Sequence, residues 1–155
     1  MELSIPAALK TLSAAGNAIK ELAAWKRKTK GNARSLVGEL KDNMTYLDMV
    51  AEDGVALKKV IEKISVSEYK RLSKEGYDFN ILKKGKIAKY ISLEGTELSS
   101  WTGKETGELV ESIYDKLNKL KIRYPHLSKN KKYRWNIRVN NIRKRIWLLL
   151  KHVGS

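Results

Sequence analysis

Apolar residues recur at steps of three and four along the first part of the chain, which is the spacing of one face of an α-helix. One such segment covers residues 5–28, a second covers residues 36–51, and a third, shorter one covers residues 55–64. The pairs Gly31-Asn32 and Asp53-Gly54 separate these segments, and such residue types are common at helix ends. The pattern predicts three consecutive helices.

The middle of the chain is less regular. Ser65 and Glu68 have the spacing of a capping box, which predicts a short helix through Leu72. Short apolar pieces follow, and then a loop rich in Gly, Ser and Thr that extends to residue 100. We therefore expect an insertion of short helices in this part of the chain.

Two long amphipathic segments follow this insertion. The first starts at Thr102-Gly103-Lys104-Glu105, which has capping-box spacing. We expect Pro125 to end it, because proline disfavours the helical conformation in the residue before it. The second is expected from about Asn130 to Val153. No segment alternates apolar and polar residues as a half-buried strand does. The prediction is a single all-α domain over residues 1–155: a helical bundle of about four long helices with a short-helix insertion between residues 65 and 100.

Composition narrows the possible cofactors and compartments. The chain has no cysteine, which excludes disulfides, thiolate metal sites and cysteine nucleophiles. Its two histidines, His126 and His152, form no cluster with metal-ligand spacing, so we expect neither a metal nor another cofactor. The run from Ile146 to Leu150 is far shorter than the ~20 residues of a spanning helix, and the N-terminus lacks the positive start of a secretory signal. We expect a cytoplasmic protein without a transmembrane segment.

Charge is distributed unevenly along the chain. Residues 116–155, called here the acid-free segment, contain thirteen Lys and Arg and no Asp or Glu. They carry +13 of the net charge of +15, whereas residues 1–115 carry only +2. Because a surface of one sign attracts partners of the other sign, we expect nucleic acid or another polyanion as partner. An acidic protein or a second copy of the chain are the alternative partners.

The final predicted helix orders part of this charge. At about 100° per residue, its apolar residues share one face, and Arg134, Arg138, Asn141, Arg145 and His152 form a polar stripe on its shoulder. Arginine binds phosphate bidentately, so the stripe predicts a contact with the RNA or DNA backbone. The alternative is that these arginines pack on the core and pair with carboxylates of neighbouring helices. The predicted nucleic-acid-binding residues are Lys131, Arg134, Arg138, Asn141, Lys144, Arg145 and Lys151, and nearby aromatic residues that offer stacking surfaces are Tyr124, Tyr133, Trp135 and Trp147.

No motif fixes a reaction, so we expect a binding protein, with one enzymatic alternative. Arg145 precedes His152 by seven positions, which places them about two turns apart on one helical face. This pair on an all-α bundle resembles the HEPN ribonuclease superfamily, whose Arg and His act together on an RNA phosphodiester. Ile146 departs from that family's pattern, which has a polar residue after the Arg. The resemblance implies a metal-independent ribonuclease.

Two further features suggest contacts with proteins or membranes. Trp101 lies in a loop before a predicted helix start, which makes it a candidate partner-binding residue, with packing under the loop as the alternative. The alanine-rich segment at residues 7–24 is similar to the first helix of membrane-disrupting cell-death bundles of the HeLo type. That similarity implies a third function, a protein-interaction or cell-death helical bundle. Close packing of helices also explains the alanines.

Overall fold

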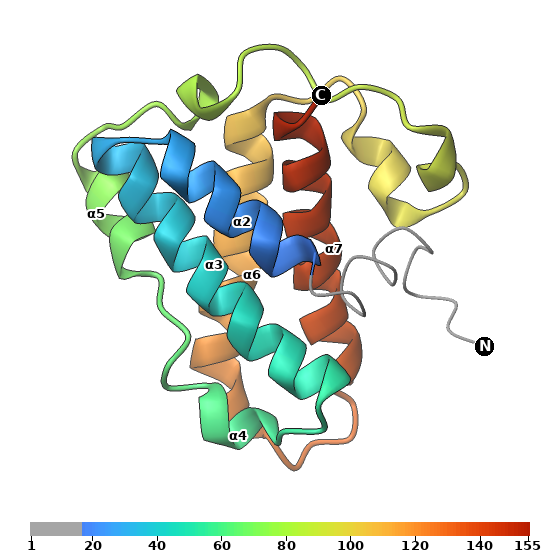
Figure 1. The fold of residues 1–155 in the computed structure, drawn as a ribbon. Coiled ribbons are helices and arrows are strands. Elements are labelled where there is room, and N and C mark those ends of the chain that lie inside the picture. Colours follow the sequence, from blue (N-terminus) through green and yellow to red (C-terminus); the bar gives the residue numbers. More distant parts are fainter. Residues whose placement is uncertain (1–16) are drawn as a thin grey trace.

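The computed structural model describes residues 17–155, and every regular element in this part of the chain is helical (Figure 1). The all-α prediction is therefore confirmed. Within residues 17–155, four α-helices and three 3-10 helices precede the two long C-terminal helices. The elements are α2 (Asn17–Lys28), α3 (Gly31–Glu52), α4 (Leu57–Val60), α5 (Ser67–Lys74), η1 (Phe79–Leu82), η2 (Ile91–Leu93), η3 (Glu97–Trp101), α6 (Thr106–Leu127) and α7 (Trp135–Val153).

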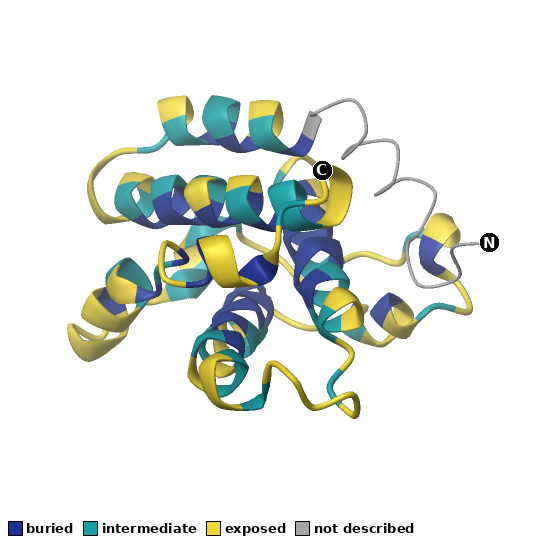
Figure 2. Ribbon diagram, turned by 90° about the horizontal axis from the view of Figure 1, so that it is seen from below, coloured by how far each residue is buried: buried dark blue, intermediate teal, exposed yellow. Residues whose placement is uncertain are grey.

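The helices α2 and α3 lie side by side as an antiparallel pair that crosses in front of α6 and α7 (Figure 1). A two-residue connection joins the two helices. Gly31 is the first residue of α3 and has a φ of 58°, a left-handed conformation that glycine adopts easily because it has no Cβ atom. Figure 2 shows the buried faces of the long helices turned toward one another. The predicted apolar face of the last helix is buried there, at Val139, Ile142, Ile146 and Leu149.

The C-terminal half of α7 is buried on more than this one face. Trp147 and Leu148 are also buried, although they lie outside the predicted apolar stripe. The insertion explains this burial, because η3 packs against α7. As a result, α7 is the most enclosed helix of the described chain, with α3, α6 and the insertion all in contact with it.

Several helix boundaries differ from the prediction. The capping box of α6 is formed by Glu105 and Glu108, three residues after the predicted one, and Thr102 instead ends η3. Pro125 does not stop α6, which continues to Leu127. Proline has no backbone N–H and so cannot donate the hydrogen bond to residue i−4, and α6 continues for only two residues beyond it.

The predicted bundle of four long helices is not confirmed. Three described helices have 19 residues or more, namely α3, α6 and α7. The segment at residues 55–64 forms only the four-residue α4, and the last helix begins at Trp135 rather than near Asn130. Residues 5–16 of the first predicted helix and most of the alanine-rich segment lie outside the described residues.

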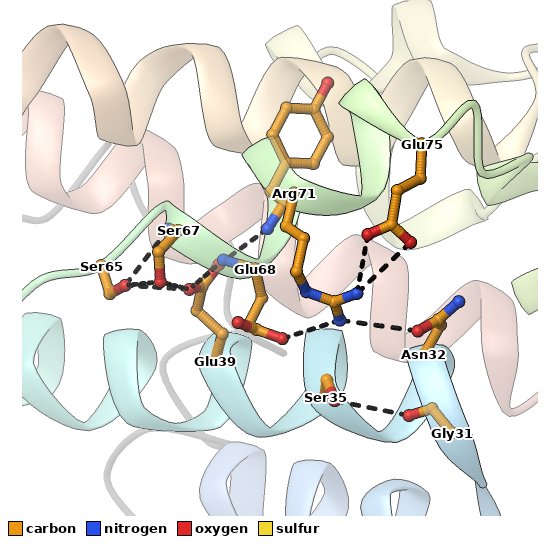
Figure 3. Close-up of polar contacts among 10 residues, drawn as sticks. Gly31, Asn32, Ser35, Glu39, Ser65, Ser67, Glu68, Arg71 and Glu75 are labelled. Atoms are coloured by element: carbon orange, nitrogen blue, oxygen red, sulfur yellow. Dashed lines mark hydrogen bonds and ion pairs between the residues drawn. The ribbon is translucent and has the colours of Figure 1, made fainter.

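The helix α5 is attached to α3 by a buried carboxylate (Figure 3). Glu39 of α3 accepts hydrogen bonds from the backbone N–H groups of Glu68 (2.8 Å) and Tyr69 (3.3 Å) and from the hydroxyls of Ser65 (2.9 Å) and Ser67 (3.2 Å). The predicted capping box of Ser65 with Glu68 is therefore wrong: the Ser65 hydroxyl accepts from the N–H of Ser67 at 3.2 Å, whereas the N–H groups of Glu68 and Tyr69 donate to a residue of another helix.

Candidate nucleic-acid interface

A cleft of about 400 Å³ separates the C-terminal half of α6 from the N-terminal half of α7. Six cationic side chains line it, and no Asp or Glu of residues 17–155 belongs to its lining. We call this surface the basic cleft. Its cations are Lys116, Lys119 and Arg123 from α6, and Lys132, Arg134 and Arg138 from the start of α7 and the turn before it.

Helical spacing brings these cations together. On α6, Lys116, Lys119 and Arg123 are three and four positions apart and therefore share one face. Arg138 lies in the first turn of α7, four positions after Arg134, which immediately precedes that helix. The turn over residues 128–134 reverses the chain, so that these two faces oppose each other across the cleft.

The basic cleft carries an electrostatic cost in the absence of a partner. Burial lowers the pKa of Lys116, and the positive charge of Arg145 lowers it further. The only ion pair of a cleft cation within residues 17–155 joins Lys119 to Asp115 at 3.0 Å, and both side chains are about half exposed. Ion pairs between exposed side chains contribute little to stability, so Lys119 can readily exchange Asp115 for a more strongly binding anion. An anion bound in the cleft would relieve the repulsion among its cations.

Three of the seven predicted nucleic-acid-binding residues line the basic cleft: Arg134, Arg138 and Asn141. Lys131 is exposed on the turn outside the cleft lining, and Lys151 is exposed at the other end of α7, where its Nζ lies 5.4 Å from the centre of the Tyr90 ring. These two cations are separate from the cleft.

The remaining two predicted cations are engaged inside the fold. Lys144 is buried and donates to Glu97 of η3 at 3.1 Å. Arg145 is 11% exposed, donates from Nη1 to the backbone oxygen of Asn141 and lies 4.0 Å from Glu97. Burial lowers the pKa of Arg145, which the charge of Glu97 opposes. The place of Arg145 matches the alternative interpretation of the stripe, in which its arginines pair with carboxylates of neighbouring helices, and Lys144, which lies outside the stripe, pairs with the same carboxylate.

Arg143 is the most deeply buried cation of the acid-free segment. It is 1% exposed and donates from Nε to Asp48 at 2.8 Å, from Nη1 to Asn140 at 2.7 Å and from Nη2 to Glu52 at 2.7 Å. These contacts use the guanidinium as a connection between α7 and α3. Arg143 is therefore part of the core.

Sequence reasoning missed four cations of the basic cleft, namely Lys116, Lys119, Arg123 and Lys132. The spacing of the three on α6 was a usable signal, because it repeats the pattern seen on the last helix. The same residues also complete a core helix, so their spacing alone does not indicate a binding surface. The cleft depends on both helices together.

The ribonuclease alternative depends on Arg145 and His152, and each has a partner inside the fold. His152 is 2% exposed, and its Nε2 lies 2.8 Å from the hydroxyl of Thr106. That hydroxyl donates to the backbone oxygen of Lys83, so the imidazole donates its Nε2 hydrogen to Thr106. Burial lowers the pKa of His152, and the nearby Lys83 lowers it further. An RNA phosphodiester cannot reach this imidazole without opening the packing around it.

Trp101 is half-buried at the end of η3 and packs against the hydrophobic core, with Lys104 Nζ 4.8 Å from its ring centre. This position matches packing under the loop. Its role as a partner-binding residue stays a prediction.

Comparison with protein-family models, with curated proteins and with solved structures gives no significant match to the chain. Within residues 17–155, no helix is both long enough and apolar enough to cross a membrane. The same residues contain no group of three or more His, Asp or Glu side chains placed to hold a metal ion.

Proposed function

We propose that this protein binds the sugar–phosphate backbone of nucleic acid in the basic cleft between α6 and α7. The observation that supports the proposal is the convergence of six cations from α6, from α7 and from the turn between them on one concave surface, whose lining within residues 17–155 contains no carboxylate. Cations that neutralise phosphates release condensed counterions, and this release supplies most of the affinity of non-specific binding.

The identity of the cations suits phosphate oxygens. Three of the six are arginines, whose planar guanidinium groups bind two phosphate oxygens at once. The three lysines add compact positive charge that tolerates changes in backbone position. Among the lining residues, Asn141 alone has a side-chain amide suited to a base edge, so we expect binding with little dependence on sequence.

Salt dependence gives a quantitative test. If all six cations contact phosphates, log K falls with log salt with a slope of about 4 to 5. The slope is measured by fluorescence anisotropy of a labelled mixed-sequence oligonucleotide between about 50 and 200 mM salt. Absence of binding at the lowest salt concentration would overturn the proposal.

Charge reversal locates the site. The double variant Lys119→Glu/Arg134→Glu places two carboxylates in the cleft, and we expect it to abolish binding at about 150 mM salt. The matched control is Lys131→Glu/Lys151→Glu, which changes the net charge equally at exposed positions outside the cleft lining. We expect this control to bind within about threefold of the wild type. Equal loss in both variants would mean that overall charge, and not the cleft, drives binding.

A further inference from the structure

Three aromatic side chains pack together beside the basic cleft. Trp135 stacks on Tyr133, with ring centres 5.4 Å apart and planes 14° apart, and it meets the ring of Tyr124 edge to face at 5.1 Å. We call Tyr124, Tyr133 and Trp135 the aromatic cluster. All three are only partly buried, and Tyr124 and Trp135 also pack against the hydrophobic core, so the cluster lies at the edge of the core.

Arg138 connects this cluster to the cleft. It lines the basic cleft, and its Cζ also lies 4.9 Å from the ring centre of Tyr133 and 5.7 Å from that of Trp135. The sequence Lys132-Tyr133-Arg134-Trp135 interleaves the two sites, because Lys132 and Arg134 line the cleft while the aromatic residues between and after them form the cluster. A ligand that pairs with these cations therefore passes directly beside the rings.

The aromatic cluster also contains an unsatisfied hydrogen-bond donor. Trp135 Nε1 is buried and has no acceptor among residues 17–155. A buried N–H without a partner costs stability, and most folded proteins pair such groups. The half-buried rings and the guanidinium over them therefore place an aromatic surface directly beside the cleft cations, in a cluster whose own hydrogen bonding is incomplete.

We infer that the ligand of the basic cleft is single-stranded nucleic acid, with an unpaired base stacked on Tyr133 while its phosphates pair with the cleft cations. This inference rests on the proposed function. Every base has a π-face, so stacking on tyrosine adds affinity without sequence preference. A duplex keeps its bases stacked inside its own helix, and the aromatic cluster then gains nothing. Phosphate binding draws Arg138 from the rings toward the backbone, which frees the stacking surface.

The test compares three probes with the same number of phosphates: a single-stranded oligonucleotide, the same strand without bases, and a duplex. The variant is Tyr133→Leu, which keeps apolar bulk but removes the aromatic ring. Tyr90→Leu is the matched control, because Tyr90 is also half-buried under a cation, Lys151, but lies outside the cleft. Binding of inorganic polyphosphate reports whether each variant retains an intact cleft.

We expect Tyr133→Leu to weaken binding of the single strand by about 5- to 150-fold, which corresponds to the energy of one base–aromatic stack. Binding of the abasic strand and of polyphosphate stays within about twofold, and the Tyr90→Leu control matches the wild type for all probes. The affinity of the wild type for the single strand exceeds its affinity for the abasic strand, and this ratio equals the factor by which Tyr133→Leu weakens binding of the single strand. DNA and RNA versions of the single strand test whether the sugar contributes.

The outcomes separate the inference from the function on which it rests. If the wild type binds duplex, abasic strand and single strand equally and the cleft charge reversal abolishes all three, the cleft binds phosphates and the stacking inference is overturned. If Tyr133→Leu weakens polyphosphate as much as the single strand, the ring supports the cleft structurally and stacking is again overturned. If no probe binds at low salt, both the proposed function and the inference fail.

Discussion

Arg143 donates from Nε to Asp48 Oδ1 at 2.8 Å, and this ion pair joins α7 to α3 inside the core. Burial raises the pKa of Asp48, and the charge and hydrogen bond of Arg143 oppose that rise. The second carboxylate partner, Glu52, is 37% exposed and is therefore better solvated than Asp48. The pair places a full positive charge where water cannot reach it, so its partners must remain in place.

We expect Arg143→Ala to lower the free energy of unfolding by about 3 kcal/mol, because it leaves Asp48 buried without its cation and opens a cavity. Chemical denaturation measures this loss. The control Arg138→Ala removes a partly exposed guanidinium at the cleft and should change stability by about 0.5 kcal/mol or less. Equal effects of the two variants would contradict a core role for Arg143.

Glu39→Gln tests the connection between α3 and α5. Four donors converge on the Glu39 carboxylate. The amide of glutamine has only one acceptor oxygen, and its NH₂ group is itself a donor and cannot accept these hydrogen bonds. We expect a loss of about 2 kcal/mol and faster hydrogen exchange at the amides of Glu68 and Tyr69. Glu62→Gln, at an exposed position after α4, should leave both unchanged. Normal protection of those two amides in Glu39→Gln would rule out the capping role.

Stability should depend on pH through His152. Its pKa in the folded protein lies below the ordinary value of 6.5, so the unfolded chain binds the proton first as pH falls. The stabilisation is fully present above pH 6.5 and is lost as pH falls from there toward the folded-state pKa. Urea unfolding between about pH 5 and 8 measures the slope.

Two variants test whether His152 causes this pH dependence of stability. His152→Gln keeps a donor for Thr106 but does not titrate, and we expect it to flatten the dependence below pH 6.5. His126→Gln replaces the exposed histidine near the end of α6, and the slope should persist. A slope that survives His152→Gln would assign the dependence to other groups.

Affinity for nucleic acid should fall as pH rises through the lowered pKa of Lys116. Burial and Arg145 disfavour the charged amine in the free protein, whereas a bound phosphate favours it, so binding takes up protons. Titration of an oligonucleotide at constant salt between about pH 8 and 10 measures this linkage. Lys116→Arg stays charged and should weaken the pH dependence, while Lys119→Arg should retain it. An unchanged dependence in Lys116→Arg would remove this residue from the site.

The sequence predicts features that depend on local spacing. The helical class, the core face of α7 and the approximate extents of α3 and α6 all follow from apolar residues at steps of three and four. Helix boundaries follow less directly from local spacing, because the capping box of α6 uses Glu105 as its N-cap, a residue type that the Ser/Thr pattern of such a box does not indicate.

Contacts between distant segments account for the remaining differences. The helical wheel grouped Arg134, Arg138 and Arg145 on one stripe, yet the first two line a cleft and the third lies beside Glu97. The stripe runs along the helix, and different neighbours cover its two ends. The role of Glu39 also depends on a distant segment, because nothing in the sequence around residue 39 indicates that its carboxylate caps a helix beginning at Ser67.

That capping arrangement has a consequence for the order in which the chain folds. An isolated helix of eight residues is too short to persist in water, and α5 receives no cap from its own N-cap residue. Its order depends on a side chain 28 positions before its first residue and on the amide of Asn43, which bonds both backbone groups of Ser65. We therefore expect α5 to form after α3 during folding and to open before it during unfolding, as a late-forming unit whose timing is set by another helix.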